Sequence, residues 1–355
     1  MASIAILSMY SGIVERGVET FAYEVARRLA AKHKLTVFQS GRATSKKFKV
    51  IEVKTFVSPP KSSAGIIGKL YLDWQSLKVL IFSLKILPKI LKGKYDLIMP
   101  LNGGWQTLIF RIFSKITGSK ILISGHAGIG SDDAFNLLLR PDVFVALTKA
   151  EFNWAERLVP EVHKVIIPNG VDLARFNPKV KPVNLSLAKP VVVCASALVS
   201  YKRVDLTIKA VAKTKNLSLL VLGEGQLHGS IDTLGKRLLG KRYLRIVVPY
   251  AQIPSYYRAA NIFTLASKTE AFGISYVEAM ACNLPVVTTA DDSRTEIIGP
   301  AGILTDPNNT MQYAKDLELA ARTNYKNTPY MQAIKFSWNK ITQRYSDLIH
   351  QMLAR

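Results

Sequence analysis

The chain has few of the residues that build disulfide frameworks, metal centres or membrane spans. It has two cysteines among 355 residues, and its five histidines form no HxxxH pair. This scarcity argues against a disulfide-stapled fold and against a metal site of histidine or cysteine ligands. No stretch has about 18 uncharged apolar residues in a row, which argues against a conventional membrane-spanning helix. We therefore expect a globular cytoplasmic protein.

Acidic residues are also scarce. The sequence has 25 Asp and Glu against 48 Lys and Arg, which gives a formal net charge of +23. A charge of this sign favours an acidic partner, and the candidates are nucleic acid, an anionic membrane surface and phosphorylated small molecules. Nucleic acid is the least favoured of the three, because the basic residues are spread along the chain and no RRM, zinc-finger or helix-turn-helix pattern is present.

The length of the chain suffices for two domains with separate hydrophobic cores. Short apolar runs of strand type alternate with segments of helical periodicity in both halves, which indicates α/β domains. The segment 177–190 is rich in Pro and Lys and lacks periodicity, so it is the predicted linker. The predicted domain boundary lies near residue 180.

The stretch 263–289 contains the clearest functional pattern. A strand, a loop, a helix and a second strand are predicted at Phe263–Ala266, Ser267–Gly273, Ile274–Cys282 and Pro285–Thr289. Gly273 lets the backbone approach a ligand closely, and the helix start beyond it offers free N–H groups to a phosphate. Glu270 and Glu278 bracket the loop and are placed to accept hydrogen bonds from polyol hydroxyls. The alternative is that both are ordinary solvated charges.

Two further strand-to-helix loops carry residues suited to phosphate. Gly17 lies at the mouth of the first predicted helix, where a phosphate contact and a plain turn both remain open. Lys202 and Arg203 place cations at the entrance of a helix in the second half, an arrangement that suits a diphosphate.

The stretch 267–286 resembles the signature S-x-x-E-x-F-G-x-x-x-x-E-A-M-A-x-G-x-P-V of the retaining, GT-B-fold glycosyltransferases called family 4. The matching residues are Ser267, Glu270, Phe272, Gly273, Glu278, Ala279, Met280, Ala281, Pro285 and Val286. Asn283 stands where the family has Gly, and Asn tolerates the left-handed conformation expected at a helix end. Further matches at 168–172, 223–225 and 336–338 extend the resemblance over nearly the whole chain.

The resemblance implies a fold and an activity. The fold is GT-B, with two facing doubly wound Rossmann-like domains and an interdomain cleft. Residues 1–180 would form the acceptor-binding domain and 181–335 the nucleotide-sugar-binding domain, and helix 336–355 would pack back on the first domain. The activity would be retaining transfer of a mannose- or glucose-type hexose from a GDP- or UDP-hexose to a hydroxyl of a glycan or lipid-linked acceptor, in cell-envelope polysaccharide or glycolipid synthesis. No obligatory metal or other cofactor is implied. The alternatives are a sugar-nucleotide epimerase of the same fold and a non-catalytic nucleotide or nucleic-acid binding protein.

The resemblance also assigns roles to particular residues. The expected catalytic residues, which support the donor sugar or the leaving group, are Glu270, His126 and Lys202. The expected donor-binding residues are Gly17, Arg203, Gly223, Glu224, Phe272, Gly273, Ile274 and Glu278. Ala197 stands where the family has an arginine that binds the diphosphate, and we expect Arg203 or another nearby cation to compensate for that loss.

The segment 65–94 predicts a basic amphipathic helix. Leu70, Trp74, Leu77, Ile81 and Leu84 form an apolar stripe, and Lys78, Lys85, Lys89 and Lys92 gather beside it. Pro88 is expected to end or kink this helix. Two interpretations remain open. The stripe either lies on an anionic membrane, which would place the protein on the cytoplasmic face of that membrane, or packs on the sheet while the lysines face solvent.

Overall fold

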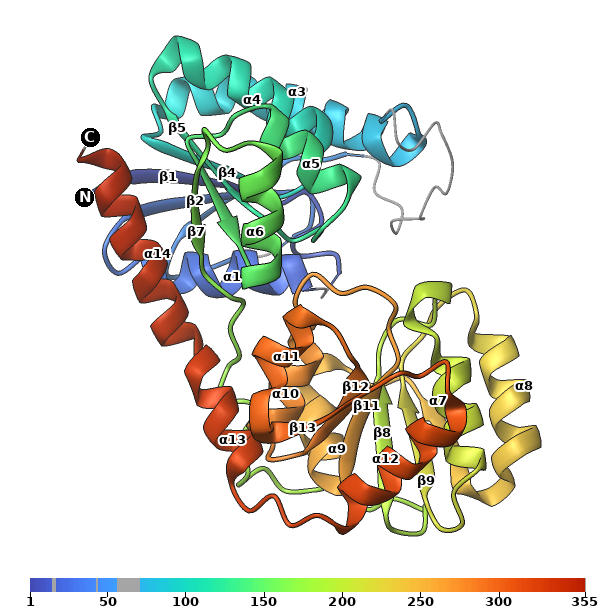
Figure 1. The fold of residues 1–355 in the computed structure, drawn as a ribbon. Coiled ribbons are helices and arrows are strands. Elements are labelled where there is room, and N and C mark those ends of the chain that lie inside the picture. Colours follow the sequence, from blue (N-terminus) through green and yellow to red (C-terminus); the bar gives the residue numbers. More distant parts are fainter. Residues whose placement is uncertain (15–16, 43, 56–70, 355) are drawn as a thin grey trace. The chain divides into compact units, whose positions relative to one another are not determined.

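A computed structural model describes residues 1–14, 17–42, 44–55 and 71–354 of the chain (Figure 1). The chain divides into two compact units. Unit 1 comprises Met1–Asn169 and Trp338–Arg355, and unit 2 comprises Gly170–Ser337. The division falls earlier than the predicted residue 180, because the Val171 N–H donates to the Phe336 carbonyl oxygen at 2.8 Å and so ties the segment before the predicted linker to unit 2.

In the described part of unit 1, a parallel sheet has the strand order β3-β2-β1-β4-β5-β6-β7. The strands are β1 Ser3–Leu7, β2 Lys34–Gln39, β3 Lys49–Glu52, β4 Leu97–Pro100, β5 Lys120–Ser124, β6 Val143–Ala146 and β7 His163–Ile166. The helices are α1 Gly17–Leu29, α3 Trp74–Gly93, α4 Gly104–Thr117, α5 Ser131–Leu138, α6 Lys149–Leu158 and α14 Trp338–Leu353.

Two apolar cores hold the helices of unit 1 on opposite faces of its sheet. One face packs against α1 and α14, through residues such as Phe21 and Ile341. The other face packs against α3, α4, α5 and α6, through residues such as Phe82 and Phe110. Strands buried on both sides are expected when helices cover both faces of a parallel sheet. The closing helix α14 lies beside α1, and its Tyr345 hydroxyl is 3.0 Å from the Ser124 hydroxyl (Figure 1).

Unit 2 contains a second parallel sheet, with the strand order β10-β9-β8-β11-β12-β13. Its strands are β8 Val191–Ala195, β9 Ser218–Leu222, β10 Tyr243–Ile246, β11 Ile262–Leu265, β12 Val286–Thr289 and β13 Gly302–Thr305. Its α-helices are α7 Val204–Ala212, α8 His228–Leu239, α9 Ile253–Ala259, α10 Ile274–Ala281, α11 Asp292–Ile298, α12 Thr310–Arg322 and α13 Thr328–Ala333.

Both units are doubly wound, as the predicted fold class requires. In each sheet the strand order reverses beside the first strand, between β1 and β4 in unit 1 and between β8 and β11 in unit 2. Ligands of open α/β sheets bind beyond the carboxyl ends of the strands at such a reversal. A ligand of unit 2 is therefore expected at the loops that follow β8 and β11.

Several local predictions can be compared directly with the structure. The predicted strand–loop–helix–strand stretch is confirmed as β11, α10 and β12. Asn283 has the expected left-handed backbone, with φ of 64°. Pro88 does not end its helix, because α3 continues through it to Gly93. Proline has no N–H group, so Pro88 cannot donate to the Leu84 carbonyl oxygen four residues earlier. Both residues lie on the exposed side of α3, where water can donate to that oxygen instead. Among the described residues, no helix is long and apolar enough to cross a membrane.

Candidate active site

Lys202 and Glu270 form an ion pair across the point where the strand order of unit 2 reverses. Lys202 ends a short 3-10 turn, Ser200–Lys202, in the loop after β8, and Glu270 lies in the loop after β11. The Lys202 ammonium donates to a Glu270 carboxylate oxygen, and the two side chains are 14% and 12% exposed. Both predicted catalytic residues of unit 2 therefore lie together, with little exposure, at the carboxyl end of the sheet.

The Arg203 guanidinium is hydrogen-bonded to three other segments of unit 2. Its guanidinium donates to the Ala266 carbonyl oxygen at 2.7 Å, to Asn308 at 3.1 Å and to Thr289 at 3.3 Å. Ala266 follows β11, Thr289 ends β12 and Asn308 precedes α12. Arg203 therefore links three segments at the carboxyl end of the sheet. Its predicted compensation for Ala197 stays a prediction.

The turn that contains Gly223, Glu224 and Gly225 packs directly on the loop that leads to Lys202. A Cβ added at Gly223 would lie 1.9 Å from the Ser196 carbonyl oxygen, closer than any non-bonded contact allows. The Leu198 N–H donates to the Glu224 carbonyl oxygen at 2.9 Å. Glu224 is itself exposed, and Arg245 binds its carboxylate at 3.1 Å. Glycine is therefore required at 223 so that the two loops can meet.

The start of α10 is shaped by Gly273. This residue has φ of 81°, and a Cβ there would lie 2.3 Å from the Tyr276 ring. The predicted donor-binding residues Gly273 and Ile274 thus open a helix whose first N–H groups have no intrahelical partners, the arrangement that attracts anions. Phe272 is buried, and its ring packs edge-on against Phe336 at a centroid distance of 5.6 Å. Its side chain therefore anchors the loop, which leaves its backbone for any ligand contact.

Glu278 lies within the second turn of α10 and is 6% exposed. The Tyr250 hydroxyl donates to its carboxylate, and the Arg175 guanidinium lies 5.0 Å from the centre of the Tyr250 ring. Burial raises the pKa of the Glu278 carboxyl from 4.5 to about 7, although the Tyr250 hydrogen bond and the charge of Arg175 both act to lower it. No local sequence pattern indicates the contact with Tyr250.

The raised pKa of Glu278 predicts a specific pH dependence of stability. A carboxyl that titrates near pH 7 when folded and near 4.5 when unfolded stabilises the fold fully below about pH 4.5. That contribution is lost as pH rises through 7, and it amounts to about 3 kcal/mol. The free energy of unfolding of wild type minus that of Glu278→Gln should therefore fall between pH 5 and pH 8 in urea titrations. A difference that stays constant across this range would show that Glu278 is ionised throughout.

Arg294 is a buried cation of the site that sequence reasoning missed. It is 1% exposed, and its guanidinium donates to Asp291, to the Ser267 carbonyl oxygen at 3.0 Å and to the Tyr276 hydroxyl at 3.2 Å. Ser267 begins the loop that carries Glu270, so Arg294 holds the base of that loop. Sequence alone gives no signal for this role, because arginine is mostly found at protein surfaces.

His126 and Gly17, the predicted site residues of unit 1, belong to neighbouring elements. His126 follows β5, and its ring packs edge-on against Phe21 of α1 at 4.3 Å. Its Nε2 atom is buried and has no hydrogen-bond partner within the described residues. Burial lowers the pKa of His126 to about 3, so the imidazole is neutral at physiological pH. Gly17 begins α1 and is exposed. The predicted sugar and phosphate contacts of these two residues stay predictions.

Asp133, a second residue that sequence reasoning did not identify, shapes the loop after His126. One of its carboxylate oxygens accepts from the N–H groups of Ala127 at 3.0 Å and Gly128 at 2.9 Å. Burial raises the pKa of Asp133 to about 7, while its hydrogen bonds, the largest of them from Asn136, act in the opposite direction. Asp133 therefore fixes the backbone that presents His126.

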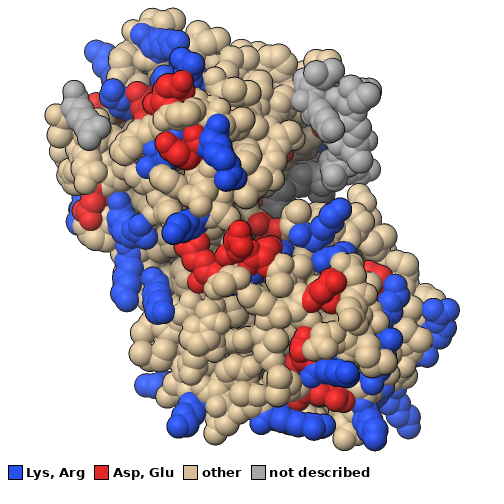
Figure 2. All heavy atoms as spheres, viewed as in Figure 1, with Lys and Arg blue, Asp and Glu red and all other residues tan. Residues whose placement is uncertain are grey.

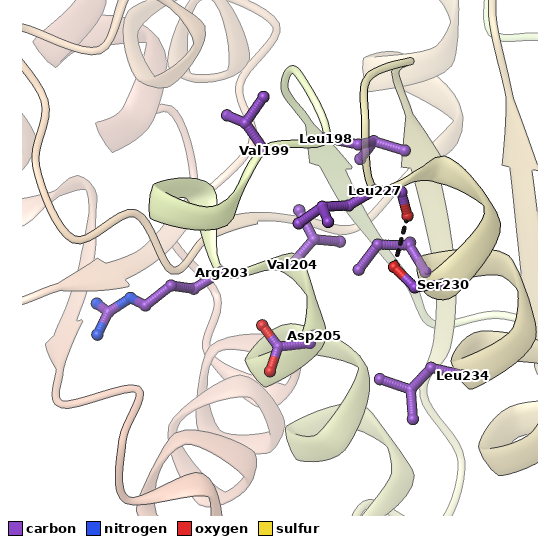
Figure 3. A pocket seen from close by; sticks show the side chains of 9 residues that line it. Leu198, Val199, Arg203, Val204, Asp205, Leu227, Ser230 and Leu234 are labelled. Carbon is purple, nitrogen blue, oxygen red and sulfur yellow. Dashed lines mark hydrogen bonds between the residues drawn. The ribbon is translucent and has the colours of Figure 1, made fainter. Parts of the chain in front are cut away.

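A cavity of about 210 Å³ lies between α7 and α8. It is lined mostly by apolar side chains, among them Leu198, Leu227 and Leu234, as Figure 3 shows. The guanidinium of Arg203 points away from it. Among its lining residues only Arg203 carries a positive charge, so the cavity offers a diphosphate no inward-facing cation. Within the described ranges, no group of three or more His, Cys, Asp and Glu could hold a metal ion.

Comparisons with known proteins agree with this architecture. Residues 177–333 match the family model "Glycosyl transferases group 1", and residues 16–175 match "Glycosyltransferase Family 4". A GDP-mannose-dependent monoacylated alpha-(1-6)-phosphatidylinositol monomannoside mannosyltransferase of Corynebacterium glutamicum is 29% identical over 154 residues, which cover 38% of this chain and 40% of that protein. The matches span less than half the length of each of the first curated relatives.

Solved structures match over the full chain. Sucrose-phosphate synthase from Thermosynechococcus elongatus has a TM-score of 0.82 at 19% identity and covers 100% of both chains. HepE from Anabaena, in complex with UDP-glucose, has a TM-score of 0.75 at 18% identity and covers 99% of this chain and 100% of its own. At such low identity, these likenesses show the shared fold.

Proposed function

Because the chain belongs to the group 1 glycosyltransferases, of GT-B fold, we propose that it moves a hexose from a nucleotide diphosphate sugar to a hydroxyl of a glycan or lipid acceptor, with retention of configuration. The observation that carries this proposal is the Lys202–Glu270 ion pair beside the start of α10. It combines a cation, a carboxylate and free helix N–H groups where the strand order of unit 2 reverses.

Each of these groups suits one part of the donor. When the bond from the sugar C1 to the phosphate oxygen breaks, negative charge develops on the leaving diphosphate. Lys202 and the N–H groups at Gly273 and Ile274 would stabilise that charge. Glu270 would accept hydrogen bonds from the sugar hydroxyls. Glu278 would accept hydrogen bonds from the ribose, with Tyr250 holding its carboxylate in place. No metal ion is required, because the diphosphate charge is met by protein groups.

The acceptor step has two candidate routes. In front-face attack, the acceptor oxygen bonds to C1 on the side that the phosphate leaves, and the departing phosphate oxygen takes the hydroxyl proton. In double displacement, a protein carboxylate first bonds to C1, and the acceptor then displaces it. We propose front-face attack, because Glu270, the carboxylate proposed to meet the sugar, is already paired with Lys202.

The proposed donor is GDP-mannose, with UDP-glucose as the second candidate. A curated relative is named as GDP-mannose-dependent, and a structural relative is named as a complex with UDP-glucose. For the acceptor we propose a lipid-linked or polysaccharide hydroxyl at an anionic membrane on its cytoplasmic face. A nucleic-acid partner is not favoured, because Lys and Arg side chains are spread over the visible faces of both units rather than gathered in one stripe (Figure 2).

A transfer assay tests this proposal. Wild-type protein is incubated with labelled GDP-mannose or UDP-glucose and a bacterial membrane-lipid extract, and both nucleoside diphosphate release and labelled glycan are measured. The anomeric configuration of the product is read by NMR. The proposal predicts release that depends on the acceptor and a product that retains the donor's configuration. Epimerised sugar nucleotide formed without acceptor would contradict it in favour of an epimerase, and an inverted product would contradict the retaining mechanism.

A further inference from the structure

The outward face of α3 is apolar over most of its length. Leu77 is 39% exposed, and Trp74, Leu84 and Leu91 are 62%, 52% and 49% exposed. Their spacing places them on one side of the helix. The opposite side, which includes Phe82, packs into the core on the sheet. The apolar stripe predicted from the sequence is thus not the side that holds α3 on the sheet. Leu70 of that stripe lies outside the described residues.

Lysines border this exposed apolar face. Lys85, Lys89 and Lys92 are exposed, and α3 contains no acidic residue. The Lys85 ammonium donates to the Lys54 carbonyl oxygen at 2.9 Å. Lys78 is buried instead, with its ammonium 5.7 Å from the centre of the Trp74 ring, so it does not contribute to the exposed charge. The exposed face of α3 therefore joins apolar and positively charged side chains with no compensating acid on the same helix.

The neighbouring helix α4 carries the same combination. α4 packs beside α3 on the same face of the sheet. Its Ile112 and Ile116 are 57% and 79% exposed, Lys115 between them is exposed, and α4 has no acidic residue. We call the set Trp74, Leu77, Leu84, Lys89, Leu91, Lys92, Ile112, Lys115 and Ile116 the α3–α4 surface.

We propose that the α3–α4 surface docks unit 1 onto an anionic lipid bilayer, with α3 lying in the plane of the interface. Exposed apolar side chains bordered by lysines match the two layers of such an interface, the acyl boundary and the anionic headgroups. A helix of this composition lies on a membrane rather than spanning it, and α3 falls short of the apolar length needed for crossing. This inference rests on the membrane location proposed above and assigns it to named residues.

Vesicle co-sedimentation of the full chain tests the proposal. Vesicles of phosphatidylcholine alone are compared with vesicles that contain phosphatidylglycerol, at low and high salt. The charge variant carries Lys89→Glu, Lys92→Glu and Lys115→Glu. Its matched control carries Lys213→Glu, Lys215→Glu and Lys236→Glu, three exposed lysines of unit 2 that give the same change in net charge. An apolar variant carries Leu77→Ser, Leu84→Ser and Leu91→Ser and keeps the charge. Circular dichroism and thermal unfolding verify that each variant is folded.

We expect wild type to prefer the anionic vesicles, and the charge variant to lose about 100-fold or more in partitioning, since each of its three lysines near the surface contributes about fivefold. The control should change less than about 3-fold. The apolar variant should lose the binding that survives high salt. Equal losses in the charge variant and the control would overturn the proposal in favour of diffuse attraction.

The outcomes separate this surface from the proposed transferase activity. If wild type binds anionic vesicles and both α3–α4 variants bind as tightly, the surface assignment is wrong and the membrane location stands. If wild type binds no vesicle, both the surface and the membrane location fail. In either case, nucleotide binding by the same proteins, measured by calorimetry, reports on unit 2 alone and decides the donor site independently.

Discussion

Replacement of Lys202 by alanine is expected to lower turnover by about 10²- to 10³-fold, the usual cost of removing one group that stabilises developing negative charge. In the proposed mechanism the Lys202 ammonium meets the leaving diphosphate as its charge increases. The variant also leaves Glu270, 12% exposed, without its cation. Steady-state measurement of nucleoside diphosphate release with the preferred donor gives the effect.

Lys209→Ala is the matched control for this prediction. Lys209 is an exposed lysine of the adjacent helix α7, and its ion pair with Asp205, at 2.8 Å, lies outside the proposed site. Its removal should leave turnover within about twofold of wild type, because exposed ion pairs contribute little. Turnover of Lys202→Ala within the same twofold range would remove Lys202 from the catalytic residues.

Gly223→Ala is expected to damage both stability and donor binding. The added Cβ would lie 1.9 Å from the Ser196 carbonyl oxygen, and the backbone there must move to admit it. Such overpacking costs about 1 to 3 kcal/mol of unfolding free energy. The displaced segment leads to Lys202, so donor affinity should fall at least about tenfold with it. Urea unfolding and calorimetric titration with nucleotide measure the two effects.

Gly229→Ala provides the control for the glycine substitution. Gly229 lies in α8, and an added Cβ there meets no atom within 4 Å. Alanine in a helix is favoured over glycine by up to about 1 kcal/mol, so this variant should be as stable as wild type or slightly more stable. If Gly223→Ala behaves in the same way, the contact between the two loops does not constrain the site.

The strands and helices around the donor loop were predictable from sequence, because their patterns are local. β11, α10 and β12 follow from apolar runs and from turn residues within a few positions of each other, and Asn283 was predicted in its left-handed conformation. The strand β3 and the helix α5 were not predicted, since both are short.

The partnerships within the site were less accessible to sequence reasoning. Lys202 and Glu270 were each predicted to act, but their ion pair joins residues 68 positions apart and depends on the strand order. Arg294 was missed because nothing local marks a buried arginine. Helical periodicity likewise showed that Trp74 and Leu84 share a face of α3 without showing that this face points outward. Such information arises only when the elements pack together.

Calorimetric titration of UDP, GDP and their sugar forms into wild type and Glu278→Ala is the decisive test of a nucleotide-sugar site in unit 2. Such a site predicts that wild type binds one base in preference to the other. It also predicts that the variant, verified as folded by its unfolding transition, binds that nucleotide about 10- to 100-fold more weakly. Equal affinity in the two proteins, or no nucleotide binding by wild type, would contradict it.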